Sequence, residues 1–226
     1  MTIGFRILKR RRAVDAQRAE AFRALPVANV SDSMSRMFAG GARLRPVYRG
    51  GTMAGPAFTV RTRPGDNLMV HKALDIAQPG DIVVVDAGGD LTNAIIGEIM
   101  VAMAAQRRLG GIVINGAIRD HAALSSGSFP VFAAGVTHRG PYKDGPGEIN
   151  VPIAIDGMTI EPGDLIIGDA DGLLCVPYDQ VDAVYAATHA KHAAEEKTLA
   201  DIAAGVPQDR AWVVATLKRL GCEIES

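Results

Sequence analysis

Continuous apolar runs, rather than alternating ones, mark the predicted strands of this chain. One follows Pro79-Gly80, another is Ile112-Val113-Ile114, and a third follows Pro162-Gly163. A strand without polar alternation is covered on both faces. The spacing of apolar residues becomes helical over 13–25, 66–77, 94–109 and 178–204, and again after Asp120. We therefore predict a layered α/β fold with additional helices at both ends, and a single domain over 1–226.

A short unit made of a turn and a strand occurs twice. QPGDIVVVDAGGD begins at Gln78, and EPGDLIIGDADGL begins at Glu161. Pro-Gly sets a tight turn, an aspartate follows, and a strand of aliphatic residues comes next. The repeat is too short to indicate a duplication, but it predicts that the same turn and strand are used twice.

Composition narrows the classes of partner. The chain has 226 residues, of which 48% are hydrophobic and 22% charged, as in globular proteins, and its formal net charge is -1. We expect neither a nucleic acid nor a membrane as partner, because no overall charge attracts them and no apolar run has membrane-spanning length. The run RILKRRR at 6–12 is typical of a solvated helix face.

The two cysteines give an indication of the cellular compartment. Cys175 and Cys222 lie far apart and match no metal-ligand spacing. The chain also begins without the apolar stretch and small-residue cleavage site of a signal peptide. We therefore expect free thiols and a cytoplasmic location.

A cation and an anion stand together where the central apolar strand is predicted to end. The run at 112–114 breaks at Asn115-Gly116, and Arg119 and Asp120 precede an alanine-rich helix. A guanidinium binds carboxylates through two parallel hydrogen bonds, and an aspartate is a hard oxygen ligand for Mg²⁺ or Mn²⁺. The pair thus suits a metal-bound 2-oxo acid. A surface ion pair beside a helix N-terminus is the alternative.

An isolated carboxylate strengthens that hypothesis. Glu98 follows Gly97 inside the apolar stretch NAIIGEIMVAMAAQ. A carboxylate in a buried helix needs a partner or a purpose, unless its side chain reaches solvent. If the helix begins near Gly97, the free N–H groups of Ile99 and Met100 form an anion site.

Three segments resemble a known family. GEIMVAMAAQRRLGGIVINGAIRD, with PVFAAG and PGDLIIGDADGLLCVP after it, is similar to the family shared by 4-hydroxy-4-methyl-2-oxoglutarate aldolase and the regulator of ribonuclease E activity A. The resemblance covers about 25–205. Its most specific part is an acidic residue, twenty intervening residues and then Arg-Asp, the spacing of Glu98, Arg119 and Asp120.

The resemblance implies a fold and an activity. The fold is a layered β/β/α sandwich of the swivelling-domain type, similar to phosphohistidine domains. The activity is that of a class II pyruvate aldolase, which needs a divalent metal, Mg²⁺ first and Mn²⁺ or Co²⁺ as alternatives. It cleaves 4-hydroxy-4-methyl-2-oxoglutarate or 4-carboxy-4-hydroxy-2-oxoadipate and decarboxylates oxaloacetate. A non-catalytic binding protein of the ribonuclease E regulator type is the alternative.

The resemblance also assigns site residues. Arg119 would bind the pyruvyl carboxylate and keto group, Asp120 would ligate the metal, and Gly97 with the N–H groups of Ile99 and Met100 would hold the carboxylate. The family's aldolases have Asp where this chain has Glu98, which places the proton-transfer step in question. A homotrimer or homohexamer is implied, in which a C-terminal-helix carboxylate reaches an adjacent subunit; Glu195 or Glu196 is the candidate.

Other polar residues are weaker candidates for a catalytic or binding role. Lys72, in an apolar stretch, is the candidate for a Schiff-base mechanism, although its ammonium group is expected to reach solvent. His71 lacks a second ligand at metal-binding spacing. In the loop over 137–148, Arg139, Tyr142 and Lys143 are candidates to meet a distal carboxylate of the substrate, or are simply solvated.

Overall fold

A sheet of ten strands forms the centre of the molecule. The computed structural model describes residues 3–38 and 40–224. The strand order is β1-β8-β3-β4-β6-β7-β2, with β5 beside β6, and β11 joins β12 to β3. These strands are β1 Phe5–Ile7, β2 Arg45–Pro46, β3 Met53–Thr62, β4 Ile82–Asp86, β5 Ala94–Ile96, β6 Gly111–Ile118, β7 Val131–Val136, β8 Gly147–Ile149, β11 Leu165–Asp169 and β12 Gly172–Val176, and a separate ribbon pairs β9 Ile153–Ile155 with β10 Met158–Ile160.

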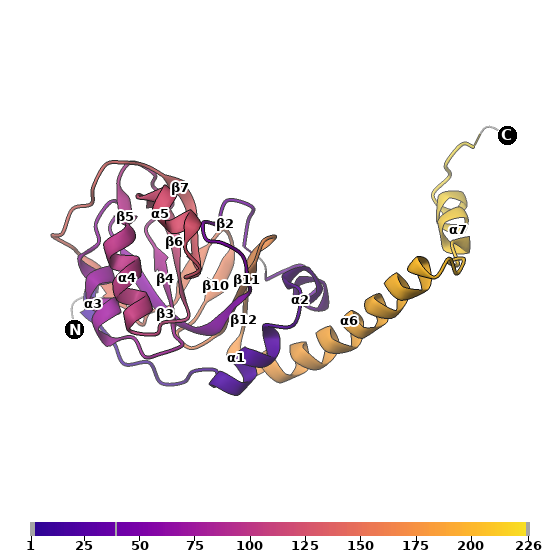
Figure 1. The fold of residues 1–226 in the computed structure, drawn as a ribbon, viewed down its shortest axis with the longest axis horizontal. Helices are drawn as coiled ribbons and strands as arrows, with labels where there is room; N and C mark the ends of the chain where they lie inside the picture. Colours follow the sequence, from indigo (N-terminus) through magenta and orange to yellow (C-terminus); the bar gives the residue numbers. More distant parts are fainter. Residues whose placement is uncertain (1–2, 39, 225–226) are drawn as a thin grey trace.

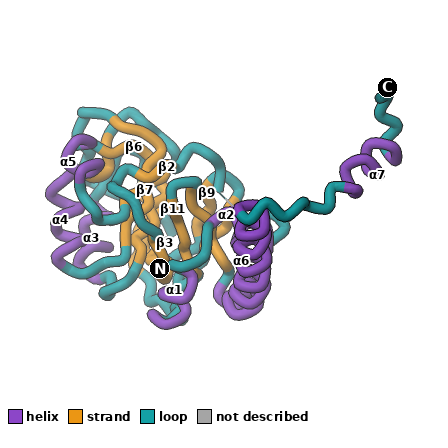
Figure 2. The backbone as a smooth tube through the Cα atoms, turned by 45° about the vertical axis from the view of Figure 1, so that its right-hand side comes forward, coloured by secondary structure: helices purple, strands orange, loops and turns teal. Residues whose placement is uncertain are grey.

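Helices cover the strands in two groups (Figure 1). Helices α3, α4 and α5 share a buried cluster with one face of β3, β4, β6 and β7, and the β9–β10 ribbon with β12 shares a cluster with the other face. Helices α1, α2 and α6 pack on the outer side of β11 and β12 (Figure 2). The helices are α1 Ala16–Phe22, α2 Val27–Ser33, α3 Leu68–Ile76, α4 Glu98–Gln106, α5 His121–Ser126, the 3₁₀ turn Tyr178–Gln180, α6 Val181–Ala203 and α7 Ala211–Arg219. The predicted layered β/β/α sandwich with helices at both ends is confirmed.

The apolar run of β4 shows why the strands lack alternation. Val83 and Val85 point toward the helices, whereas Ile82 and Val84 point toward the ribbon. All four side chains are fully buried. A strand between two apolar layers therefore has no polar face, as the sequence predicts.

The repeated turn has the same hydrogen bonds at both places. The side chain of Asp81 accepts from the backbone N–H of Gln78 at 2.8 Å, and that of Asp164 accepts from Glu161 at 2.9 Å. Each turn feeds a strand beside β3, since β4 pairs with it in parallel and β11 antiparallel. The prediction that one unit is used twice is confirmed.

The prediction of a strand that ends at Asn115-Gly116 is wrong. β6 continues through these residues to Ile118, with a register shift against β7. The Asn115 side chain donates to Asp86 of β4 at 3.1 Å, and its backbone carbonyl accepts from Ala87 and Gly89. These bonds are made across to the neighbouring strand, so the pair forms a bulge rather than a turn.

The helix predicted over 94–109 is also too long. Its first three residues form β5, parallel to the end of β6, and α4 begins only at Glu98. Gly97 lies between the two elements in an extended conformation, which ends the strand. A short apolar strand and a buried helix have the same hydrophobic pattern, so periodicity does not separate them.

The basic run at 6–12 is not a helix face. Residues 5–7 form β1, parallel to β8, and the chain after them is extended. Arg6 pairs with buried Glu148 at 2.6 Å, and Arg10 pairs with buried Asp81 at 2.7 Å. Carboxylates that are distant in the sequence therefore hold this segment against the rest of the domain. The spacing of charges within the segment does not reveal these ion pairs.

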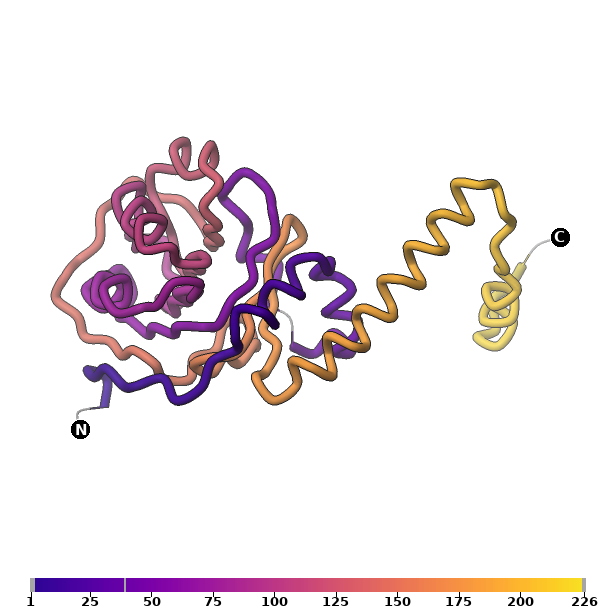
Figure 3. Tube along the Cα trace, turned by 60° about the horizontal axis from the view of Figure 1, so that its bottom comes forward, coloured from indigo at the N-terminus to yellow at the C-terminus, as the bar shows by residue number. Residues whose placement is uncertain are grey.

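The C-terminal helices form an arm that leaves the body (Figure 3). α6 contacts α1 at its beginning and α2 further along, where Lys191 and Glu195 meet Asp32 and Asn29, and Val181 and Thr188 are its buried residues. None of the side chains of α7, in the part that the structure describes, is buried. None of the helices described is long and apolar enough to cross a membrane. The large exposed apolar residues of the arm and the described residues after it are Leu199, Ile202, Val206, Trp212, Val214, Leu220 and Ile224.

The two cysteines are expected to react with a thiol reagent at very different rates. Both are free, Cys175 buried and Cys222 exposed. Burial raises the pKa of the Cys175 thiol, and the nearby Asp164 carboxylate adds to the shift. With 5,5′-dithiobis(2-nitrobenzoate) we expect one fast equivalent from the native chain and two after denaturation, because the thiolate is the reactive form. A Cys222→Ser variant that retains a fast thiol in the native state would contradict this burial.

Candidate active site at the junction of β5, β6 and α4

The candidate site lies where two parallel strands end together. Ile96, the last residue of β5, pairs with Ile118, the last residue of β6. The backbone N–H of Arg119 donates to the carbonyl of Ile96 at 3.0 Å. The residues just beyond the two strands, Gly97 on one side and Arg119 with Asp120 on the other, are therefore brought together. This is the edge at which parallel sheets bind ligands.

Asp120 has an unusual backbone conformation. Its φ is 58° and its ψ 36°, the left-handed region, which aspartate tolerates better than most side chains. Although Asp120 precedes α5, its side chain makes no capping hydrogen bond there. Its Oδ2 instead accepts from the backbone N–H of Glu98 at 2.9 Å, and lies 3.8 Å from Nε of Arg119. The turn thus aims this carboxylate at the start of α4.

Gly97 allows the close approach of these groups. An added Cβ would overlap with Oδ2 of Asp120 and would lie 2.9 Å from Cγ of Arg119. The backbone of Gly97 is extended, with φ -150° and ψ -167°, so its freedom of rotation is not the reason for a glycine. The missing side chain is the reason.

The N-terminus of α4 presents free donors, as the sequence predicts. The helix begins at Glu98, whose N–H donates to Asp120, and the N-cap residue Gly97 has no side chain to cap the donors that follow. Among residues 3–38 and 40–224, the N–H groups of Ile99 and Met100 have no hydrogen-bond acceptor. Unpaired donors and the helix dipole make this end attractive to an anion.

Glu98 is not in buried surroundings, contrary to the sequence-based expectation. The residue is exposed, and its side chain is absent from the lining of the cavity described below. α4 covers the sheet through Met100 and Ala104, and Glu98 lies on the outward side of the helix. Only the Glu98 backbone contacts Asp120, and the catalytic role of its carboxylate stays a prediction.

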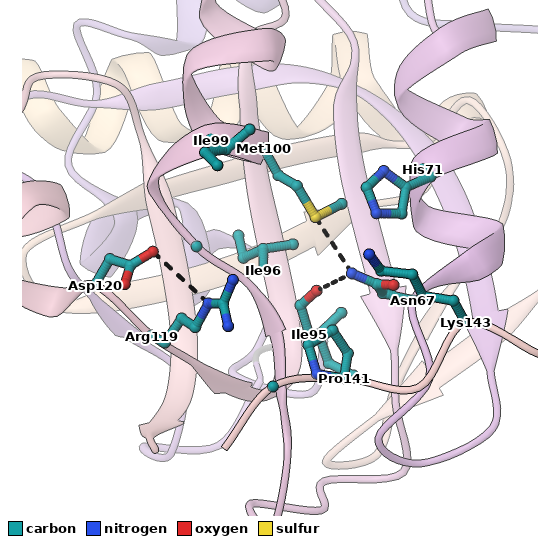
Figure 4. A pocket seen from close by; sticks show the side chains of 12 residues that line it. Asn67, His71, Ile95, Ile96, Ile99, Met100, Arg119, Asp120, Pro141 and Lys143 are labelled. Atoms are coloured by element: carbon teal, nitrogen blue, oxygen red, sulfur yellow. Dashed lines mark hydrogen bonds and ion pairs between the residues drawn. The ribbon is translucent and has the colours of Figure 1, made fainter. Parts of the chain in front are cut away.

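A cavity of about 300 Å³ opens over this junction. This volume is at the lower end of the range for ligand sites, which suits a small molecule. Arg119 and Asp120 lie at one end of it, Asn67, His71 and Lys143 at the other, and Ile96 and Met100 between them (Figure 4). The remaining lining residues are Ile95, Gly97, Ile99, Gly140 and Pro141.

The sequence does not indicate that Asn67, His71 and Lys143, at the second end of the cavity, belong to one site. From the sequence, Lys143 is one of three candidates to bind a distal carboxylate of the substrate, whereas His71 is only an isolated histidine without a second ligand. Of those three candidates, only Lys143 lines the cavity, without Arg139 or Tyr142. No local motif joins Asn67 to Lys143, because they lie on segments far apart in the chain.

Three other predicted residues lie elsewhere. Lys72 is exposed and is not part of the cavity lining, which removes the basis for the Schiff-base alternative. Glu195 accepts from Asn29 at 2.7 Å and pairs with Lys191 at 3.0 Å within its own chain. Hydrogen bonds from Lys191 and Asn29 lower the pKa of Glu195. Glu196 is exposed, 3.6 Å from His192, and the reach of either glutamate into an adjacent subunit stays a prediction.

The donor set suits a hard, largely hydrated cation. Within the described residues, no group of three His, Cys, Asp or Glu side chains is arranged to hold a metal. Asp120 is the one carboxylate that lines the cavity, and its Oδ1 makes no hydrogen bond to another described residue. Mg²⁺ usually keeps several waters and takes only one or two carboxylates, so the residues present fit it.

The fold and the site define a class: a β/β/α sandwich whose cavity lies where β5 and β6 end and α4 begins. The family model described as RraA-like, Aldolase/RraA, matches residues 27–175, which include every residue of the cavity. The chain belongs to this RraA-like family.

A relative from Halalkalibacterium halodurans, provisionally named 4-hydroxy-4-methyl-2-oxoglutarate aldolase, is 40% identical over 192 residues, 85% of this chain and 91% of its own. Among solved structures, an uncharacterized protein from Pseudomonas syringae has a TM-score of 0.77 at 25% identity, covering 85% of this chain and 95% of its own. The RNA-processing inhibitor RraA from Thermus thermophilus has a TM-score of 0.63 at 30% identity, and the match covers 67% of this chain and 92% of the inhibitor.

Proposed function

We propose that this protein is a divalent-metal-dependent class II aldolase that releases pyruvate from a 4-hydroxy-2-oxo diacid of the 4-hydroxy-4-methyl-2-oxoglutarate or 4-carboxy-4-hydroxy-2-oxoadipate type and decarboxylates oxaloacetate. One observation carries the proposal: a guanidinium, a carboxylate and a helix N-terminus with two free N–H groups surround one small cavity. The name of the H. halodurans relative supports it.

The three groups suit the pyruvyl half of such a substrate. Its carboxylate is expected to accept from the N–H groups of Ile99 and Met100 at the start of α4. Arg119 then lies beside the keto oxygen, where negative charge develops as the bond between C3 and C4 breaks. Asp120 would hold the divalent cation, which supplies Lewis-acid stabilisation of that charge.

Pyruvate release from oxaloacetate tests the proposal directly. We expect activity with Mg²⁺, loss of activity with excess chelator, and about a 100-fold decrease in Arg119→Ala, because a fixed charge at the reacting oxygen is removed. Arg139→Ala is the matched control, since Arg139 is an exposed cation of the nearby loop that does not line the cavity. Absence of activity with any divalent metal would favour a binding role of the ribonuclease E regulator type.

A further inference from the structure

The end of the cavity opposite Arg119 has its own polar groups. Asn67 is the residue before α3, His71 lies one turn further along α3, and Lys143 comes from the loop between β7 and β8. Figure 4 shows the Lys143 side chain extending into the cavity toward Asn67 and His71, at the end opposite Asp120. Resting on the proposed function, we propose that these three residues form a subsite for a carboxylate on the leaving half of the substrate, which makes the enzyme selective for diacids.

Asn67 provides the observation that points to a ligand. The residue is only 2% exposed, and its Nδ2 donates to the carbonyl of Ile95 at 2.9 Å. Its Oδ1 is buried without a hydrogen-bond partner. An unpaired buried acceptor is unfavourable, so a donor on a ligand, such as the hydroxyl of a 4-hydroxy acid, would stabilise this end of the cavity.

Charge at this end favours an anion. Lys143 is the one cationic side chain among the described residues that line this end of the cavity, and no ion pair with another described residue involves it. Burial lowers the pKa of His71, and the charge of Lys143 lowers it further. His71 is therefore a neutral donor or acceptor near pH 7, and Lys143 carries the net charge. An ammonium and an imidazole beside each other are suited to bind a carboxylate.

The loop that carries Lys143 is fixed in place. The backbone N–H groups of Asp144 and Gly145 both donate to Oδ2 of buried Asp66 at 2.8 Å. Oδ1 of the same carboxylate accepts from Leu68, in the first turn of α3, at 2.9 Å. Asp66 is thus a positioning residue that holds the Lys143 loop against the helix of His71, so this end of the cavity is preorganised.

Two 2-oxo acids that differ in one group test the subsite. 2-Oxoglutarate has a distal carboxylate, 2-oxopentanoate has a methyl group there, and neither can undergo the cleavage. With Mg²⁺ present, we expect 2-oxoglutarate to bind at least about 10-fold more tightly by calorimetry, as for one charge-assisted contact. Lys143→Ala is expected to remove the difference, and Lys143→Arg to retain most of it.

Lys72→Ala is the matched control, because it removes an equal charge beside His71 from a side chain outside the cavity. Equal affinity of the two acids, or a preference that survives Lys143→Ala, overturns the subsite while pyruvate release from oxaloacetate keeps the proposed function intact. If neither acid binds and no pyruvate is released, the proposed function fails and the subsite with it.

Discussion

Replacement of Asp120 by asparagine is expected to lower pyruvate release from oxaloacetate about 1000-fold, because the one carboxylate that lines the cavity among the described residues loses its charge. Asparagine tolerates the left-handed backbone of this position and retains an oxygen that can accept from the N–H of Glu98. The change therefore tests charge rather than shape. Initial rates at saturating Mg²⁺ measure the effect.

Binding of Mn²⁺, followed by electron paramagnetic resonance without substrate, should weaken in the same variant, since a neutral amide is a poor ligand for a hard cation. Asp171→Asn, at an exposed turn outside the cavity, is the control and should leave both measurements unchanged. A variant at Asp120 that binds Mn²⁺ and turns over normally would show that the metal is held elsewhere.

Gly97→Ala is expected to have a similarly large effect, about 1000-fold on the same activity, because one added methyl group displaces both Asp120 and Arg119. The extended backbone at this position accepts alanine, so the clash alone is tested. We expect a decrease of about 1–3 kcal/mol in the free energy of unfolding, as for an overpacked site. Urea denaturation followed by circular dichroism measures it.

Gly127→Ala is the matched control for this substitution. Gly127 also has an extended backbone, with φ -82° and ψ 166°, and an added Cβ would make an ordinary contact of 3.4 Å with the carbonyl of Leu124. Its activity should remain close to that of the unsubstituted protein. If Gly97→Ala were equally active, Asp120 and Arg119 would be free to move apart without loss of function.

The sequence predicts the layers of this fold better than the boundaries of its elements. The apolar run of β4 already shows that both faces of the sheet are covered. The end of β6 and the start of α4 are mispredicted, because the bonds of Asn115 to β4 and the pairing of β5 with β6 are tertiary contacts. Local patterns contain no signal for such contacts.

The sequence likewise predicts only one end of the candidate site. Arg119 and Asp120 are adjacent in sequence, and the free N–H groups of Ile99 and Met100 are predicted for a helix that begins near Gly97, although the hydrophobic pattern alone places its start at 94. The opposite end of the cavity depends on Asp66, which connects α3 to a loop 78 residues further along the chain. A single sequence offers no spacing rule for that distance, so His71 and Lys143 are associated only in the folded structure.

The position of the single tryptophan determines how this protein can be observed in solution. Trp212 lies on α7 and is 65% exposed, on an arm that begins with the 23 residues of α6. At 1.5 Å per residue, α6 is about 35 Å long. Intrinsic tryptophan fluorescence therefore reports on the surroundings of the arm and is insensitive to loss of the sheet. A blue shift with rising protein concentration would record that arm entering an apolar contact, while the tyrosines and the far-ultraviolet dichroism follow the body.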